Sequence, residues 1–156
     1  MSVVGMKKVL SLILIMLSLF LFGCSKKEIT KEEFKKIMEK EEFSVVEVTD
    51  QFKEYEYIKR AYVAVSPDAT FQVEFYVFEN NENADSFYKL NQETFEAQGS
   101  GGNISTSVNS KTYSKYSITT DEKYNYIARI NNTVLYSTVD KKYKDKVNKL
   151  VKKLGY

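Results

Sequence analysis

The order of apolar and polar residues along the chain predicts helices and strands in alternating groups. Apolar residues recur every second position in residues 70–78, where Phe71 and Val73 share one face, and this period is typical of a strand. Apolar residues three and four positions apart, such as Val147 and Leu150, predict a helix. The predicted helices span residues 30–42, 83–97 and 140–154, and the predicted strands span residues 43–49, 57–65, 70–78, 112–119, 123–130 and 133–139.

These elements follow the order α-βββ-α-βββ-α, so the predicted fold class is α+β, with an antiparallel sheet and three helices. The order is compatible with an internal duplication of an α-βββ unit. We expect the helices to pack on one face of the sheet. Residues 30–156 are long enough for a single domain with one core, and no cysteine lies among them to form a disulfide.

Local signals fix two of the element boundaries. Thr30 and Glu33 have the spacing of a capping box, so the first helix is expected to begin after Thr30. Asn131 and Asn132 stand between two strands and tolerate positive φ, which predicts a two-residue hairpin turn. The register of that hairpin sets Ile130 opposite Thr133, Arg129 opposite Val134, and Ile127 opposite Tyr136.

The first residues have the pattern of a targeting signal. Lys7 and Lys8 precede 14 residues, Val9 to Phe22, which are apolar except for two serines. As a helix this run would cover about 21 Å, which is short of the roughly 30 Å hydrocarbon core of a membrane. It therefore predicts a secretory signal peptide rather than a stable membrane span.

The end of this run resembles the lipobox of bacterial lipoproteins, because Leu21, Phe22 and Gly23 precede Cys24. The resemblance covers residues 6–24 and implies that Cys24 is diacylated and becomes the first residue of the mature protein. It divides the chain into a lipoprotein signal peptide (residues 1–23), the lipidated cysteine with a short tether (24–29) and the domain (30–156). Whether Met1 or Met6 is the true start stays open.

The implied location is the extracytoplasmic face of the cell membrane, where acylated Cys24 anchors the chain in membrane lipid. Five residues, Ser25 to Ile29, separate this cysteine from the first helix signal and reach at most about 17 Å when extended. The domain is therefore expected close to the membrane. Seven lysines between Lys141 and Lys153 make the last helix a candidate for contact with anionic lipid or wall polymer.

Charge and composition exclude several classes of function. Lys7 and Lys8 lie in the removable segment, so residues 24–156 carry 21 basic and 21 acidic residues and are formally neutral. This balance gives no support to a nucleic-acid partner. The sequence has no histidine and only one cysteine, which removes Ser-His-Asp and Cys-His catalysis and histidine metal sites. We expect no catalytic residues, no metal and no cofactor.

One catalytic pattern needs separate treatment. Ser86 and Lys89 form S-x-x-K, Ser107 and Asn109 form S-x-N, and Lys111 begins a K-T pair, in an order that resembles the penicillin-recognising enzymes. Position 113 is tyrosine where that family has glycine, and all three motifs fall within 27 positions. We therefore interpret these serines and lysines as solvated surface residues.

The sequence thus predicts a non-enzymatic binding or accessory module at the cell envelope, with an envelope protein or a wall component as partner. The alternative is a lipoprotein that binds a small molecule or a glycan. Arg129 is the one charged residue amid the apolar positions of its hairpin, and it must be paired if a helix covers it. Aromatic faces stack on sugars, so the candidate ligand-binding residues are Arg129, Tyr116, Tyr126 and Tyr136. Immunity, assembly and sensing roles, the oligomeric state and the number of envelope membranes stay open.

Overall fold

The fold is described from a computed structural model, which covers residues 26–99 and 104–156. The predicted signal peptide, Cys24 and residues 100–102 of the glycine-rich loop lie outside the described residues. In chain order the elements are α2 (Lys31–Lys40), β1 (Ser44–Glu47), the 3₁₀ turn η1 (Thr49–Phe52), β2 (Ile58–Val65), β3 (Gln72–Phe78), α3 (Asn81–Gln98), β4 (Ile104–Asn109), β5 (Tyr113–Thr119), β6 (Lys123–Ile130), β7 (Thr133–Asp140), the 3₁₀ turn η2 (Lys141–Tyr143) and α4 (Lys144–Lys153).

The strands form one antiparallel sheet in the order β1-β2-β3-β7-β6-β5-β4, so the predicted α+β class with three helices is confirmed for the described part of the chain. The hairpin register is confirmed as well: Ile130 pairs with Thr133, and Arg129 pairs with Val134. Asn131 has a φ of 50°, the positive value that the two-residue turn requires.

The capping box is confirmed at the start of α2. Thr30 Oγ1 accepts a hydrogen bond from the Glu33 amide at 3.2 Å, and Glu33 Oε2 accepts one from the Thr30 amide at 2.8 Å. The hydrogen bond that the charged carboxylate accepts from the Thr30 amide is the main reason why the pKa of Glu33 lies below its ordinary value.

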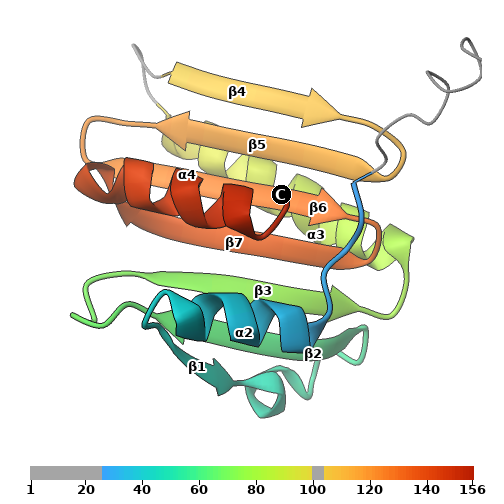
Figure 1. Cartoon of the computed structure of the whole chain (residues 1–156). Helices are drawn as coiled ribbons and strands as arrows, with labels where there is room; N and C mark the ends of the chain where they lie inside the picture. Colours follow the sequence, from blue (N-terminus) through green and yellow to red (C-terminus); the bar gives the residue numbers. More distant parts are fainter. Residues whose placement is uncertain (1–25, 100–103) are drawn as a thin grey trace, which may run out of the picture.

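The helices cover both faces of the sheet rather than one, which corrects the sequence prediction. Figure 1 shows α2 and α4 in front of the sheet and α3 behind it. Phe34 and Leu150 pack into the core on the front face, which we call the α2/α4 face, and Tyr88 packs into the core on the opposite α3 face. The reason is that the central strand β6 is buried on both sides, in all but its first residue.

Four strands follow α3, where the sequence predicts three, because residues 104–109 form β4 at the edge of the sheet. All six side chains of β4 are exposed, so the strand lacks the buried apolar face that makes a strand recognisable in sequence. The elements that follow β3 are thus α3, β4, β5 and β6, and β7 lies between β3 and β6 in the sheet (Figure 1).

The last helix also begins later than predicted. Strand β7 extends to Asp140 and η2 follows it, so α4 starts at Lys144. Tyr143 stacks on Phe71 with ring centroids 4.9 Å apart, which holds this turn against β3.

Candidate functional site

Arg129 is the one arginine buried in the described part of the chain, with an exposed fraction of 3%. It projects from β6 to the α3 face, because Tyr126 and Ala128 occupy the alternate positions on the other face. Nη1 donates a hydrogen bond to the Asn131 carbonyl at 3.2 Å. A buried guanidinium requires such partners, since an unpaired buried charge is strongly destabilising.

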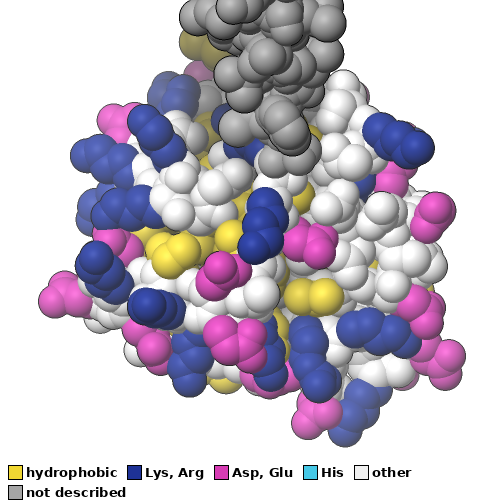
Figure 2. Space-filling view, turned by 45° about the vertical axis from the view of Figure 1, so that its right-hand side comes forward, with side chains coloured by type: hydrophobic (Ala, Val, Ile, Leu, Met, Phe, Trp, Pro, Cys, Tyr) yellow, Lys and Arg dark blue, Asp and Glu magenta, His cyan; other side chains and the backbone are white. Residues whose placement is uncertain are grey.

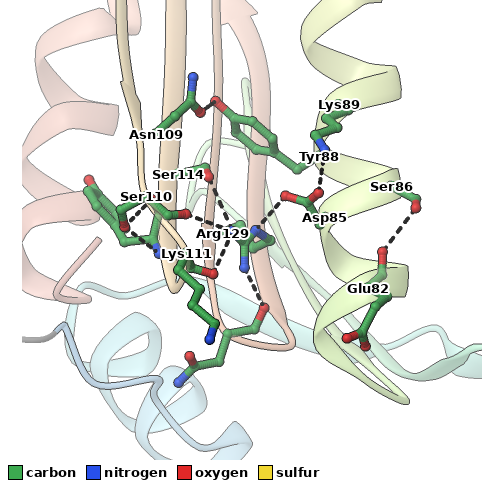
Figure 3. A network of polar contacts seen from close by, with 12 residues as sticks. Glu82, Asp85, Ser86, Tyr88, Lys89, Asn109, Ser110, Lys111, Ser114 and Arg129 are labelled. Atoms are coloured by element: carbon green, nitrogen blue, oxygen red, sulfur yellow. Dashed lines mark hydrogen bonds and ion pairs between the residues drawn. The ribbon is translucent and has the colours of Figure 1, made fainter.

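The second nitrogen of the guanidinium holds the turn between β4 and β5. Arg129 Nη2 donates to the carbonyl oxygens of Ser110 and Lys111 and to Ser114 Oγ, each at 3.3 Å. Figure 3 shows these acceptors converging on the guanidinium from one side. Arg129 therefore fixes the position of this turn relative to the centre of the sheet.

Helix α3 supplies the counter-charge. Arg129 Nε lies 3.3 Å from Asp85 Oδ1. The two atoms form an ion pair but not a hydrogen bond. The other oxygen, Asp85 Oδ2, lies 2.7 Å from Lys89 Nζ one helical turn later. Asp85 is one-third exposed, so it joins a buried cation to an exposed one (Figure 3).

A polar cavity of about 580 Å³ opens between α3 and the β4–β5 turn, with Arg129 among its lining residues. Two further cations, Lys89 and Lys111, and the carboxylates of Glu82 and Asp85 line it. The remaining lining groups are hydroxyls and amides, from Asn81, Tyr88, Gln92, Asn109, Ser110, Thr112 and Ser114. Such a cavity is suited to a polar, neutral or anionic molecule held by hydrogen bonds.

Tyr88 is the one aromatic residue among those that line this cavity. Its ring is buried under α3, and its hydroxyl donates a long hydrogen bond of 3.5 Å to Asn109 Oδ1. Burial raises the pKa of Tyr88 to about 12, although the nearby positive charge of Arg129 lowers it in part. At neutral pH the hydroxyl is protonated and can donate to a ligand.

The structure does not gather the predicted tyrosines around Arg129. Tyr126 lies on the α2/α4 face, across the sheet from Arg129. Tyr116 and Tyr136 share the α3 face but belong to the core, where Tyr136 packs on Phe95 at a centroid distance of 5.4 Å. None of these three tyrosines lines the Arg129 cavity. Burial raises the pKa of Tyr126 well above its ordinary value.

The sequence motifs that contain Lys89 and Lys111 did not predict that these residues line a cavity with Arg129. Lys89 and Lys111 were part of the Ser-Lys pattern, but Ser86 Oγ donates to the Glu82 carbonyl at 2.9 Å while Lys89 pairs with Asp85 (Figure 3). The four-residue spacing of Asp85 and Lys89 was visible in the sequence. The packing of α3 over Arg129 was not, because it depends on how the helix docks.

A second hollow lies on the α2/α4 face between α4 and the strands β4 and β5. Its volume is about 420 Å³, and Lys115, Lys144 and Lys152 line it without any acidic residue. Helix α4 carries five lysines and one aspartate. Figure 2 shows basic side chains crowding the upper left of the surface in that view, whereas basic and acidic groups alternate elsewhere.

Residues 26–29 of the expected tether lie against the folded domain. Ile29 packs on the core beneath α2. Lys26 Nζ donates to the Gly155 carbonyl at 3.1 Å and lies 4.4 Å from the centre of the Tyr113 ring. The coil before α2 therefore crosses the α2/α4 face beside the C-terminus (Figure 1).

Clusters suited to a metal ion and helices able to span a membrane are both absent from the described residues. Residues 26–99 and 104–156 contain no cluster of three or more acidic, histidine or cysteine side chains that would hold a metal ion. In the same residues no helix is both long enough and apolar enough to cross a membrane.

Comparison with known proteins gives no family for the chain. No family model matches it, and no curated protein matches it. A solved structure described as a GTP binding regulator from Thermotoga maritima is similar at 16% identity, with a TM-score of 0.46, over 81% of this chain and 85% of that chain.

Proposed function

We propose that the protein is a lipoprotein held at the extracytoplasmic face of the membrane by acylated Cys24, where it acts as a non-enzymatic binding module. The observation that carries this proposal is the docking of Lys26 on the α2/α4 face through Gly155 and Tyr113. Only Ser25 separates Lys26 from Cys24. Two residues reach at most about 7 Å, so acyl chains on Cys24 would bring this face to the lipid surface.

The positive charge of helix α4 supports that orientation. The lysines of α4 and Lys115 lie on the same side of the sheet as Lys26. Near an anionic lipid surface each lysine contributes about 1 kcal/mol, in addition to the acyl chains. The α3 face, with the Arg129 cavity, then points away from the membrane toward an envelope protein or a wall component.

Metabolic labelling with an alkyne fatty acid tests the anchor. The full chain made in a bacterium should take up the label, and Cys24→Ala should abolish it. Ser25→Ala is the matched control, because it changes the neighbouring residue and should keep the label. An unlabelled parent chain would overturn the proposal.

Proximity crosslinking in intact cells with mass spectrometry tests the binding role. The account predicts one or two abundant envelope proteins, captured by the acylated chain and lost with Cys24→Ala. Equal capture by both chains would contradict a role that depends on the anchor.

The second candidate function is binding of a small polar molecule or a glycan in the Arg129 cavity, favoured by the size and polar lining of that cavity. Its test is thermal unfolding with N-acetylglucosamine oligomers as the neutral probe and glycerol phosphate as the anionic probe. A rise in Tm that Lys111→Glu removes supports the site, with Lys35→Glu on α2 as control. Unchanged Tm with both probes would count against this candidate.

A further inference from the structure

Strand β4 has an open outer edge. It pairs with β5 in continuous register, from Ile104 opposite Thr119 to Asn109 opposite Ser114. On its other side no segment of residues 26–99 or 104–156 pairs with it, and it ends the sheet (Figure 1). Half of its backbone amides and carbonyls therefore point outward, where they can accept another strand.

Protein edges are normally protected by charge, proline, bulges or short length. The opposite edge, β1, is only four residues long and leads into η1. It also carries a charge, because Glu47 forms an ion pair with Arg60 across 3.6 Å between Oε1 and Nε. Strand β4 has six residues, Ile-Ser-Thr-Ser-Val-Asn, with no charge and no proline. Of the two edges, β4 is thus the one that lacks protection against pairing.

Two exposed apolar side chains lie on this strand. Ile104 is 71% exposed and Val108 is 45% exposed. They are four residues apart, so both point to the α2/α4 face, with Thr106 midway between them. Because the two side chains are placed symmetrically about Thr106, antiparallel self-pairing centred there would put them opposite each other.

We propose that β4 pairs antiparallel with β4 of a second copy, about a two-fold axis that passes beside Thr106. In this register Thr106 faces Thr106 of the second copy, and Ile104 faces Val108 on each side of the axis. Each exposed apolar side chain then gains an apolar cross-strand neighbour, and the two sheets become one continuous sheet. The occupant is a second copy because this pairing satisfies both apolar side chains with residues that the strand itself carries.

The symmetry of this pairing agrees with the charges around it. Lys115 is opposite Val108 on β5, so in the dimer the two Lys115 residues are separated by at least three strand spacings, about 14 Å. That distance exceeds the screening length of about 8 Å at physiological salt, so the repulsion between them is weak. The axis is perpendicular to the sheet, so both α2/α4 faces and both Lys26 residues lie on one side.

The pairing involves only five residues of each strand, a smaller contact than a stable soluble dimer has. Confinement of both copies to a surface raises their effective concentration and compensates for the small contact. The dimer is therefore tested with the full chain in intact cells.

The experiment uses Thr106→Cys with a short bis-maleimide crosslinker, followed by mass spectrometry of the product. The expected result is a dimer joined through position 106 of both copies. Val46→Cys is the matched control, because Val46 lies on the β1 edge with an exposed fraction of 54% and should give little dimer. A Thr106→Cys chain that remains monomeric, gives no more dimer than Val46→Cys, or attaches to a different protein would overturn the proposal.

Two charge variants in the Thr106→Cys chain test the register. Ile104→Lys with Val108→Lys places lysine opposite lysine and should reduce the dimer at least about tenfold. Ile104→Lys with Val108→Glu places opposite charges across the axis and should restore it. Dimer that persists in the first variant, or fails to return in the second, contradicts the pairing. A crosslink through Cys24 would instead show an unacylated thiol, so failure of the anchor is recognised separately.

Discussion

Arg129 and Asp85 form an ion pair between the centre of the sheet and helix α3, with 3.3 Å between Nε and Oδ1. The arginine is 3% exposed and the aspartate is one-third exposed. The pair is the point at which α3, the β4–β5 turn and the β6–β7 turn are tied together, since the same guanidinium binds carbonyls of both turns.

Replacement of Arg129 should therefore destabilise the protein strongly. We expect Arg129→Met to lower the free energy of unfolding by about 3–5 kcal/mol, because the carbonyls of both turns lose their donor and Asp85 keeps only Lys89. Asp85→Asn should cost about 1.5 kcal/mol, since the arginine keeps its hydrogen bonds. Urea unfolding measures both values.

Arg60→Ala is the control for this prediction. Arg60 forms an exposed ion pair with Glu47, so its removal should cost less than about 1 kcal/mol. Equal losses for Arg129→Met and Arg60→Ala would show that burial of the guanidinium contributes nothing to stability.

The capping box of α2 gives a second prediction. Thr30→Ala removes the acceptor for the Glu33 amide and should lower the free energy of unfolding by about 1 kcal/mol. Thr94→Ala, on the exposed side of α3, should change it by less than about 0.5 kcal/mol. Thermal unfolding of the two variants provides the comparison, and an unchanged Tm for Thr30→Ala would contradict it.

Asp68 should make stability depend on pH in the acid range. Its Oδ1 accepts hydrogen bonds from the hydroxyls of Thr70 and Ser66, at 2.7 and 2.8 Å, and these lower the pKa of the carboxyl from 3.8 to about 2. Because the folded pKa is the lower one, the stabilisation is present above about pH 4 and is lost as the pH falls toward 2.

Urea midpoints measured at about pH 6 and about pH 2.5 check this sign. The parent chain should lose more stability between the two conditions than Asp68→Asn does. Asp121→Asn, an exposed aspartate in the β5–β6 turn, should behave like the parent. An Asp68→Asn chain with the same loss as the parent would rule out this role for Asp68.

The elements that the sequence predicted correctly are those whose determinants are local. The Thr30 capping box and the Asn131 turn each depend on residues only a few positions apart, and both are confirmed. Strand β4 was missed because all six of its residues are exposed and only Ile104 and Val108 are apolar. The two-sided packing was missed because no local signal states which face a helix covers.

The candidate site was predicted only in part, for the same physical reason. Arg129 was identified because a charge within an apolar hairpin is unusual, and it proved to be covered by α3 and paired. Its partners Asp85, Ser110 and Lys111 are 18 to 44 positions away in sequence, and tertiary packing alone brings them together. Tyr116, Tyr126 and Tyr136 were predicted to accompany Arg129 because they lie in the same group of strands. Most of the surface of each ring is instead packed in the core.

The central claim is that the α2/α4 face lies against the membrane and the α3 face points away from it. Its most direct test is labelling of single cysteines by a bulky, impermeant maleimide, in cells whose wall has been digested. Lys144→Cys reports on α4 and Leu90→Cys on α3, where Leu90 is 63% exposed. We expect fast labelling at position 90, and slow labelling at position 144 that becomes fast when detergent releases the protein. Equal labelling rates at the two positions in the anchored protein would contradict it.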